Sequence, residues 1–420
     1  MAKKTEAAPK MPPRSSRAAE LMEWVNKKMK GHAQLKVASE YVLPFMTRRM
    51  HTGLLSLDVE LRGGFPCGGL SQLVGPYNSG KTYLAWQVIR QQQYFKGDDV
   101  SVLLAMTEMR ADRTQARLAG VAISLGDEDI DNLDRARAAA GIPKFTKEER
   151  DDLRREVGTI HEVHAESAEL LFDVILKGIQ DNAYHIIVID SFGSIMSAAE
   201  AESKSLEEKH YSGAAKPITE FLRKMGSLLT MDDENKKVRD VCILGINQVR
   251  DAIGDPNVDY RSTGGRALEH YKFVDVFVQT GRQIGYEENL YTSDGTKKRW
   301  VQTGKEVNWK IAKGKAGIHE GGRGSYIFDF RTGAGDFYLD TLVAGVRHGI
   351  IQLNGSYINL PNPENPENSL LMKQGKENFI AALVADAAHC AKEGTTDSLM
   401  NLIRSEVFKK NGIYLEYDWE

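Results

Sequence analysis

The segment GPYNSGKT constrains this chain more than any other part of its sequence. It covers residues 75–82 and matches the pattern G-x-x-x-x-G-K-[ST]. The apolar run LSQLV precedes it and the helical stretch YLAWQVIRQQQ follows it, which is the strand, loop and helix context that such a motif requires. Backbone N–H groups of this loop and the N-terminus of the helix are suited to hold a phosphate chain. The motif therefore predicts an α/β fold of the P-loop NTPase class that binds a nucleotide.

All eight residues of this loop are candidate nucleotide ligands. They are Gly75, Pro76, Tyr77, Asn78, Ser79, Gly80, Lys81 and Thr82. We expect the Lys81 ammonium group to neutralise β- and γ-phosphate oxygens, and the Thr82 hydroxyl group to coordinate Mg²⁺. Lys81 is therefore also a candidate catalytic residue.

Four short apolar runs predict buried parallel strands. They cover residues 70–74, 100–105, 185–189 and 241–246. Each run is rich in Val, Ile or Leu and is followed by polar residues, as expected of parallel strands that end at a binding site. After Lys272, the alternating runs VDVFVQTGR, RWVQTGKEVNWKIAKGK and GSYIFDF indicate antiparallel hairpins. We therefore expect a mixed, mainly parallel sheet.

Polar residues follow three of the predicted strands. Asp190 ends HIIVID, Glu108 follows VSVLLAMT, and Asn247 and Gln248 end ILGINQ. Because the carboxyl ends of parallel strands meet at one edge, Asp190 is a candidate metal ligand and Glu108 a candidate base that orients water. An amide of the third strand is a candidate sensor of the γ-phosphate. The alternatives are that Asp190 caps a turn and that Glu108 is simply solvated.

The chain divides into three predicted regions. They are an N-terminal arm and helix at 1–45, a nucleotide-binding core at 46–335, and a small C-terminal α/β domain at 336–420. We expect the Pro-, Ala- and Lys-rich arm to be disordered, with a transit peptide as the alternative. The helix in RAAELMEWVNKKMKG carries an apolar stripe, which packs either on its own domain or on a neighbouring subunit.

Two segments interrupt the regular pattern. The charged stretch at about 124–157 predicts a solvated helical excursion, in which a capping box formed by Thr146 and Glu149 opens a helix that ends near Gly158. In the C-terminal domain, the Pro/Asn stretch at 361–368 predicts a loop, followed by a helix in FIAALVADAAHCAKE and a polar tail.

Composition excludes several classes of protein. The 55 Lys and Arg against 58 Asp and Glu give a net charge of -3, so a nucleic-acid partner requires a local basic groove. The apolar runs fall short of the roughly 18 residues that span a bilayer, so we expect no membrane role. Cys67, Cys242 and Cys390 are widely separated, which argues for a reducing compartment and against disulfides and a zinc site, so we expect three small core or loop residues.

Six segments, in order, resemble the RecA family of DNA strand-exchange recombinases. They are HTGLLSLDVEL with GGFPCGGLSQLVGPYNSGKT, EMRADRTQARLAGV, HIIVIDSFGSI, INQVRDAIGDPN, TGGRALEHY and KIAKGKAG. The resemblance extends through most of residues 46–360, and TGGRALEHY separates this family from related helicases and clock-type ATPases. It implies a RecA-like core that binds ATP and Mg²⁺ and hydrolyses ATP in a DNA-dependent way.

The resemblance also implies roles for single residues of the nucleotide site. Glu108 resembles the glutamate that activates water, Asp190 the aspartate of the metal site, and Gln248 the residue that links the γ-phosphate to a DNA-binding loop. Asp112 falls where the family contacts adenine. Gln115 stands where an aromatic residue is usual.

Lys313 and Lys315 lie on one face of a predicted strand. Alone they would be ordinary solvated edge lysines. The resemblance instead implies that they enter the ATP site of the adjacent subunit as catalytic residues. It thus implies a homo-oligomeric helical filament with ATP at each interface.

Two segments resemble the DNA-binding loops of the family, one from about Glu200 through HYSGAAKPITEFLRK and one at 250–266. The candidate DNA contacts are Tyr211, Lys216, Arg223, Arg250, Gly264, Gly265 and Arg266. Lys and Arg neutralise phosphates, glycine N–H groups approach the backbone closely, and tyrosine stacks on bases. Without the resemblance, Lys216 and Arg223 would fit an ordinary polar helix face equally well.

The resemblance implies an ATP-dependent recombinase that forms a filament on single-stranded DNA and pairs it with homologous double-stranded DNA. Two other functions stay open: a ring-forming helicase or replication ATPase on the same fold, and a recombination mediator that binds ATP but hydrolyses it poorly. We expect a cytoplasmic, DNA-associated protein of a bacterium or of a phage-infected cell.

Overall fold

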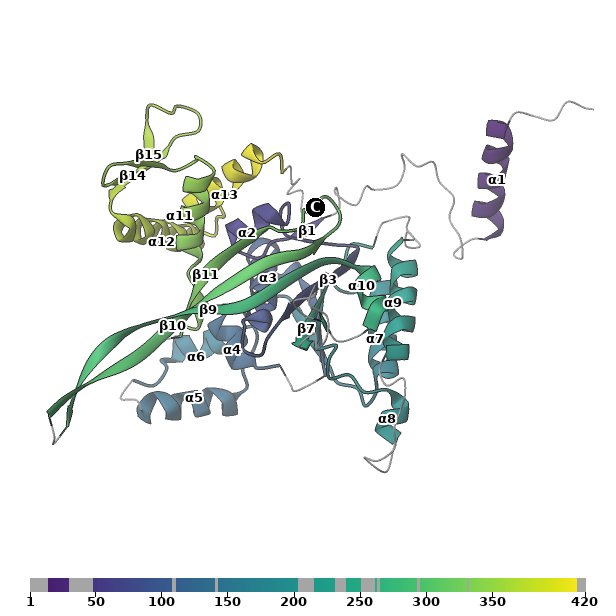
Figure 1. Ribbon diagram of the computed structural model, residues 1–420, viewed down its shortest axis with the longest axis horizontal. Coiled ribbons are helices and arrows are strands. Elements are labelled where there is room, and N and C mark those ends of the chain that lie inside the picture. The colour runs from purple at the N-terminus through teal and green to yellow at the C-terminus, as the bar shows by residue number, and fades with distance from the viewer. Residues whose placement is uncertain are drawn as a thin grey trace, which may run out of the picture.

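The structure is a computed structural model. It describes residues 14–29, 48–107, 111–139, 143–202, 215–230, 239–250, 261–262, 265–292, 295–330 and 332–413. A large mixed sheet lies at the centre, and helices pack against it (Figure 1).

The central sheet has the strand order β12-β11-β10-β9-β3-β7-β6-β4-β5, with β8 paired to β7 off this path. Its strands are β3 (Gly69–Gly75), β4 (Ser101–Met106), β5 (Thr159–Val163), β6 (Ile186–Asp190), β7 (Cys242–Arg250), β8 (Arg261–Ser262), β9 (Lys272–Thr292), β10 (Gly295–Gly314), β11 (Arg323–Asp329) and β12 (Ala334–Gly335). The ladders from β5 through β9 are parallel, whereas those from β9 to β12 are antiparallel. The predicted mixed, mainly parallel sheet is confirmed, and each of the four predicted parallel strands starts within one residue of the observed one.

Helices cover both faces of the parallel part of the sheet. Helices α3 (Lys81–Lys96) and α4 (Arg113–Leu118) contribute to one apolar layer, and α7 (Ala168–Gln180), α9 (Ala215–Thr230) and α10 (Gly265–Tyr271) contribute to the other. Alternate residues of β6 enter different layers, Ile186 the first and Ile187 the second. A strand that is buried on both faces needs apolar residues at every position, which explains the uninterrupted runs in the sequence.

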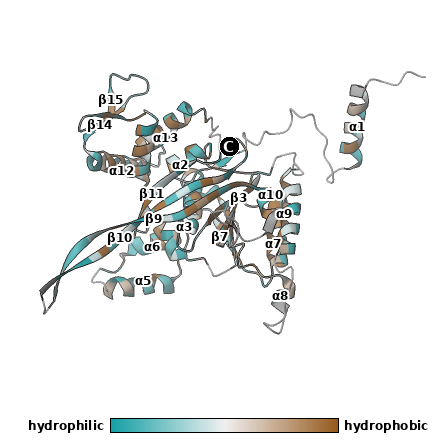
Figure 2. Ribbon diagram, viewed as in Figure 1, coloured by the Kyte–Doolittle hydropathy of each residue, from teal (hydrophilic) through white to brown (hydrophobic). Residues whose placement is uncertain are grey.

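The β9–β10 hairpin is longer than the sequence pattern predicts. The two strands pair from Thr292 and Gly295 back to Val274 and Gly314, and the hairpin extends well beyond the helices at the lower left of Figure 1. The far part of the hairpin carries polar residues on both faces (Figure 2). Apolar and polar residues therefore do not alternate there, and the sequence did not predict these parts of the two strands. Register shifts interrupt the ladder at three places, between Gln302 and Gly304, Lys305 and Val307, and Ile311 and Lys313.

The charged excursion forms two helices, α5 (Asp127–Ala139) and α6 (Lys147–Arg154), which are largely hydrophilic in Figure 2. The capping box of Thr146 and Glu149 is confirmed, because each side chain accepts a hydrogen bond from the backbone of the other residue. Helix α6 ends at Arg154, four residues before the predicted stop, because Arg155 is already extended.

The C-terminal part holds α11 (Phe337–Arg347), a three-stranded antiparallel sheet and two helices. The remaining elements are β13 (Gln352–Asn354), β14 (Tyr357–Pro361), β15 (Ser369–Gln374), α12 (Lys376–Glu393) and α13 (Leu399–Lys410). The predicted loop at 361–368 connects β14 to β15. The predicted polar tail is wrong over 399–410, because Ile403, Val407 and Phe408 bury the apolar face of α13.

The C-terminal part shares its apolar core with the central region, since Leu55 and Val59 of α2 (Leu55–Glu60) belong to the same buried cluster. Because this core crosses the predicted boundary near residue 336, the boundaries of the three predicted regions stay predictions. The other described elements are α1 (Arg14–Lys28), β1 (Arg49–Met50), β2 (Phe65–Pro66), η3 (Gly97–Asp99) and α8 (Ala198–Glu202).

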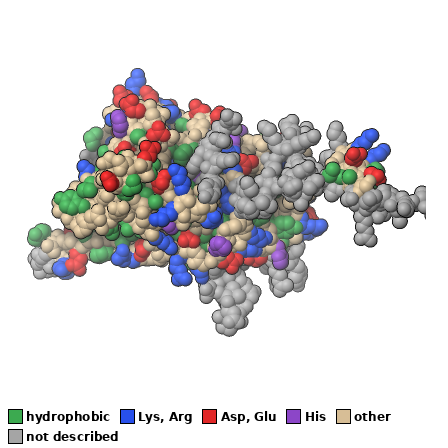
Figure 3. Space-filling view, turned by 90° about the horizontal axis from the view of Figure 1, so that it is seen from above, with side chains coloured by type: hydrophobic (Ala, Val, Ile, Leu, Met, Phe, Trp, Pro, Cys, Tyr) green, Lys and Arg blue, Asp and Glu red, His purple; other side chains and the backbone are tan. Residues whose placement is uncertain are grey.

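The predicted N-terminal helix is present as α1, which stands apart from the rest of the described chain in Figure 1. Of its apolar stripe, Leu21 is 53% exposed and Met22 and Val25 are partly buried, and Met29, just after the helix, is 41% exposed. Cys67, Cys242 and Cys390 are free and buried, so of the two alternatives, core or loop, the structure favours the core. No helix among the described residues has the length and apolar character to cross a bilayer. Side chains of both charges are interspersed over the face shown in Figure 3.

Candidate functional site

The P-loop follows β3 and opens α3, as the motif predicts. Asn78 and Gly80 adopt left-handed backbone conformations, with φ of 57° and 103°. Gly75 lies so close to β9 that a Cβ atom there would be 1.9 Å from the carbonyl oxygen of Val278. Glycine at 75 and 80 therefore lets the chain turn tightly around the space in front of α3.

Lys81 is buried within the loop. Its Nζ donates hydrogen bonds to the carbonyl oxygens of Gly75 (3.0 Å) and Pro76 (2.6 Å), and it lies 3.4 Å from Ser79 Oγ. The side chain is only 7% exposed. A buried ammonium group bonded to loop carbonyls is already placed inside the predicted phosphate site, where it can bind a phosphate oxygen.

Thr82 and Asp190 meet at the start of α3. The Thr82 hydroxyl group donates to Asp190 Oδ2 at 3.1 Å, and Asp190 is the last residue of β6. No group of three or more His, Cys, Asp or Glu side chains in the described ranges is arranged to hold a metal ion. One hydroxyl and one carboxylate suit Mg²⁺, because this ion takes most of its ligands from water and phosphate. The pair therefore fits the predicted magnesium site.

Gln248 lies beside the P-loop because β7 runs parallel to β3, and Gly75 pairs with Gln248 in the ladder. Its backbone N–H donates to Asn247 Oδ1 at 3.0 Å, and its side chain lines the cavity in front of the loop. Met106 at the end of β4 pairs with Asp190. Glu108, two residues later, lies outside the described residues, so its predicted role stays a prediction.

A cavity of about 420 Å³ lies in front of the P-loop. It is lined by Tyr77, Asn78, Ser79, Gly80, Lys81, Thr82, Tyr83, Trp86, Gln115, Leu118, Asp190, Ser191, Ile246, Gln248, Lys305, Val307, Phe328, Phe330 and Gly333. The lining includes lysine, carboxylate and amide side chains as well as the exposed apolar side chains of Leu118 and Phe330. A cavity lined by both charged and apolar side chains suits a ligand with a phosphate chain and a base.

Asp112 does not line this cavity. It is the N-cap of α4, where Oδ1 accepts the backbone N–H of Gln115 at 2.9 Å, and it faces a neighbouring cavity with Glu162 and His164. Gln115, from the first turn of α4, does line the nucleotide cavity. Of the two residues, the structure therefore brings Gln115, and not Asp112, to the predicted nucleotide site.

Lys313 is the last residue but one of β10, but Lys315 follows the end of the strand at Gly314, so the prediction that both lysines share one strand face is wrong for Lys315. Both side chains nevertheless reach the C-terminal end of α10 in their own chain. Lys313 Nζ donates to the carbonyl oxygen of Glu269, and Lys315 Nζ donates to that of His270 at 2.9 Å. Burial and the neighbouring lysines hold the pKa of Lys313 below its ordinary value. Neither lysine lines the P-loop cavity of its own chain.

The predicted DNA contacts fall in two groups. Lys216 and Arg223 are both exposed on α9, whose opposite side is buried against the sheet. The exposure of these two side chains is consistent with DNA binding and equally with an ordinary polar helix face, so both alternatives stay open. Tyr211 and Gly264 lie outside the described residues, as do the side chains of Arg250 and Arg266, and Gly265 is the first residue of α10.

Lys305 is the charged residue of the cavity that the sequence analysis missed. It comes from β10, and its Nζ donates to the carbonyl oxygen of Asn78 in the P-loop. No local pattern places a residue 227 positions away against this loop. Leu118 and Phe330 were also missed, because only the packing of α4 and β11 brings them to the cavity.

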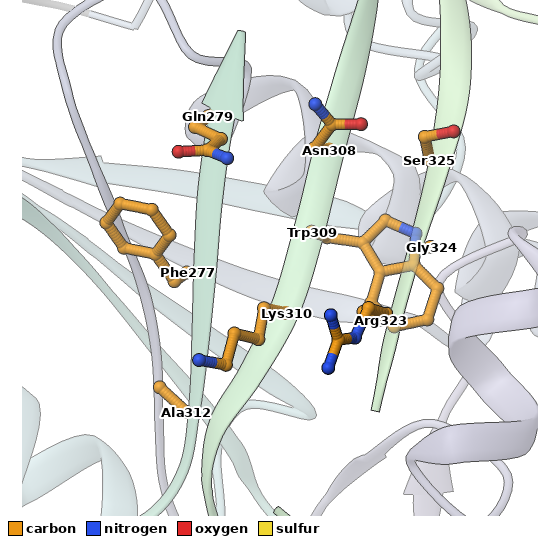
Figure 4. Close-up of a pocket in the computed structure, with 9 residues that line it drawn as sticks. All are labelled: Phe277, Gln279, Asn308, Trp309, Lys310, Ala312, Arg323, Gly324 and Ser325. Carbon is orange, nitrogen blue, oxygen red and sulfur yellow. The ribbon is translucent and has the colours of Figure 1, made fainter. Parts of the chain in front are cut away.

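Another cavity, of about 660 Å³, lies across β9, β10 and β11 (Figure 4). Its lining includes Phe277, Asn308, Lys310 and Arg323. None of the residues predicted to form a site lines this cavity, and none of its lining residues belongs to the P-loop cavity.

Comparisons with known proteins identify relatives. No protein-family profile matches the chain. It is 27% identical over 366 residues to Protein RecA of Chlorobaculum parvum, covering 86% of this chain and 82% of the relative, and 26% identical over 362 residues to Protein RecA of Chlorobaculum tepidum, covering 85% and 82%. The crystal structure of the RadB recombinase matches 67% of this chain and 97% of its own with a TM-score of 0.40 and 17% identity.

Proposed function

Because this chain is a distant homologue of RecA, we propose that it is an ATP-dependent recombinase that forms a helical filament on single-stranded DNA and exchanges strands with a homologous duplex. The observation that supports this best is the convergence of Lys81, the Thr82–Asp190 pair and Gln248 in one cavity, at the carboxyl ends of adjacent parallel strands. Ligands of open α/β sheets bind at this edge. The protein would act in the cytoplasm, on DNA.

Within the proposed site, each residue has a separate role toward the phosphate chain. Lys81 neutralises phosphate oxygens, and Thr82 with Asp190 holds Mg²⁺, which when bound withdraws charge from the phosphates. Glu108 orients the attacking water in this proposal and accepts its proton. Gln248 contacts the γ-phosphate from the last part of β7, two residues before the segment 250–266 that the resemblance assigns to DNA binding.

Filament formation is the second part of the proposal. Lys313 and Lys315 donate to the carbonyl groups of the adjacent residues Glu269 and His270 at the end of α10 in the single chain, so their ammonium groups are already directed to the same place. In a filament they would exchange these carbonyls for the phosphates of the next subunit, which couples ATP binding to assembly. Lys216 and Arg223 would meet DNA phosphates.

The proposal is tested by strand exchange and ATP hydrolysis measured together. We expect single-stranded DNA to stimulate hydrolysis by the native chain, and Lys81→Ala to lose both activities. Lys177→Ala, which removes an exposed i,i+4 ion pair with Asp181, is the matched control and should behave like the native chain. Hydrolysis that survives Lys81→Ala would contradict the assignment of the site. Hydrolysis without strand exchange would instead favour a helicase or replication ATPase.

A further inference from the structure

Lys305 is a second cation in the P-loop cavity. The residue belongs to β10 and lines the cavity, and its Nζ donates a hydrogen bond to the carbonyl oxygen of Asn78. The same cavity contains Lys81, Thr82, Asp190 and Gln248. Lys305 therefore reaches the loop from a strand that contributes no other cation to this cavity among the described residues.

The local backbone of β10 explains why Lys305 points at the loop. Register shifts lie on both sides of it, between Gln302 and Gly304 and between Lys305 and Val307. A bulge inserts an extra residue and redirects the side chains next to it, which is a frequent device beside binding sites. The neighbour Glu306 is used elsewhere, since it accepts a hydrogen bond from Ser325 and pairs with Arg282.

The charge of Lys305 is not balanced by a carboxylate. No ion pair within 4.0 Å joins it to Asp or Glu among the described residues, and its Nζ is bonded to a neutral carbonyl. Partial burial lowers its pKa from the ordinary value, and no acidic neighbour raises it. A half-buried ammonium group beside a phosphate-binding loop, without a counter-ion, is suited to bind an anion there.

We propose that Lys305 is a second lysine ligand of the polyphosphate chain, supplied by the same subunit that carries the P-loop. When the nucleotide binds, Nζ stays protonated and exchanges the carbonyl oxygen of Asn78 for a phosphate oxygen. This inference rests on the proposed function only in that the cavity takes a nucleoside triphosphate. It adds a residue to the site that the P-loop motif does not contain.

Binding should be measured by titration calorimetry without DNA, with ATP and with inorganic tripolyphosphate as probes. We expect Lys305→Ala to weaken both by the same factor, roughly tenfold, because a charge-assisted hydrogen bond to phosphate is lost. Lys305→Arg keeps the charge and should retain affinity within about threefold. Lys310→Ala is the matched control, because Lys310 lies five positions further along β10 and faces the other cavity (Figure 4). This variant should bind both probes as tightly as the native chain does.

Lys305→Gln separates a phosphate ligand from a residue that only positions the loop. The glutamine amide can still donate to the Asn78 carbonyl but carries no charge, so we expect affinity as low as in Lys305→Ala. Native affinity in Lys305→Gln, or an unchanged tripolyphosphate affinity in Lys305→Ala, would overturn the inference. Failure of the proposed function is distinguishable, because the phosphate site itself would be refuted if Lys81→Ala also bound tripolyphosphate normally.

Discussion

Arg404 of α13 ties the C-terminal helices to a buried acid of the core, and its removal makes a pH-dependent prediction. Its Nη1 lies 3.6 Å from Asp58 Oδ2, and its Nη2 donates to the carbonyl oxygen of Gly53 at 3.3 Å. Asp58 is fully buried, and Thr52 donates to its other oxygen from both the backbone and the hydroxyl group. Burial raises the pKa of Asp58 to about 6, while Arg404 and the Thr52 hydrogen bonds counteract this rise.

The magnitude follows from that pKa. A folded pKa of about 6 against 3.8 in the unfolded chain means that burying the ionised carboxyl already costs about 3 kcal/mol above pH 6. Without Arg404, the Asp58 carboxyl takes up a proton instead of staying ionised. Protonating a group with a pKa of about 6 at pH 7.5 costs about 2 kcal/mol, so the loss of the ion pair in Arg404→Ala lowers the free energy of unfolding by no more than about 2 kcal/mol at this pH. At pH 5.5, Asp58 is largely protonated in both proteins, so this additional cost falls to about zero.

The assay is urea unfolding of the native chain and of Arg404→Ala at pH 7.5 and 5.5. Loss of the Gly53 hydrogen bond and of packing adds a cost that does not depend on pH. We therefore expect the destabilisation by Arg404→Ala to be smaller at pH 5.5, by up to about 2 kcal/mol. Arg347→Ala is the control, since the exposed Arg347 lies 3.8 Å from Glu60 and should change stability by less than about 0.5 kcal/mol at either pH. A deficit that is equal at both pH values, or larger at pH 5.5, would refute this reasoning.

Two further predictions concern the P-loop and the filament. Gly75→Ala should destabilise the fold by at least about 2 kcal/mol and abolish nucleotide binding, because the alanine Cβ would lie 1.9 Å from the carbonyl oxygen of Val278. A thermal melt and a nucleotide-binding titration check this. A melting temperature and an affinity equal to those of the native chain would contradict the loop geometry. Replacing both Lys313 and Lys315 by Ala should leave ATP affinity of the unassembled chain within about twofold, because both lysines bind α10 carbonyls, while DNA-dependent hydrolysis falls at least about tenfold. Undiminished hydrolysis would exclude them from the neighbouring site.

The central sheet was predictable because its strands are buried on both faces. Ile186, Ile187, Val188 and Ile189 alternate between the two apolar layers, so their sequence is continuously apolar. The far part of β9 and β10 lacks such burial, and the sequence therefore carried no period there. Helix α13 did carry a signal, since Ser398 caps it and Ile403 and Val407 are four residues apart, but the charged residues between them obscured it.

The candidate site was predictable where it is local in sequence. The P-loop is contiguous, and Asp190 and Gln248 end strands whose order brings them to the loop. Lys305 was not predictable, because its direction depends on irregular pairing within a long hairpin. The apolar lining was not predictable either, since only tertiary packing brings Leu118 and Phe330 to the cavity.

The most direct test of the proposed function is electron microscopy of the purified chain with single-stranded DNA, Mg²⁺ and a slowly hydrolysed ATP analogue. A protein that couples nucleotide at subunit interfaces to DNA binding should form open helical filaments with the analogue, and should lose them when the analogue is omitted. Closed rings, or a chain that stays unassembled on the DNA, would contradict the account.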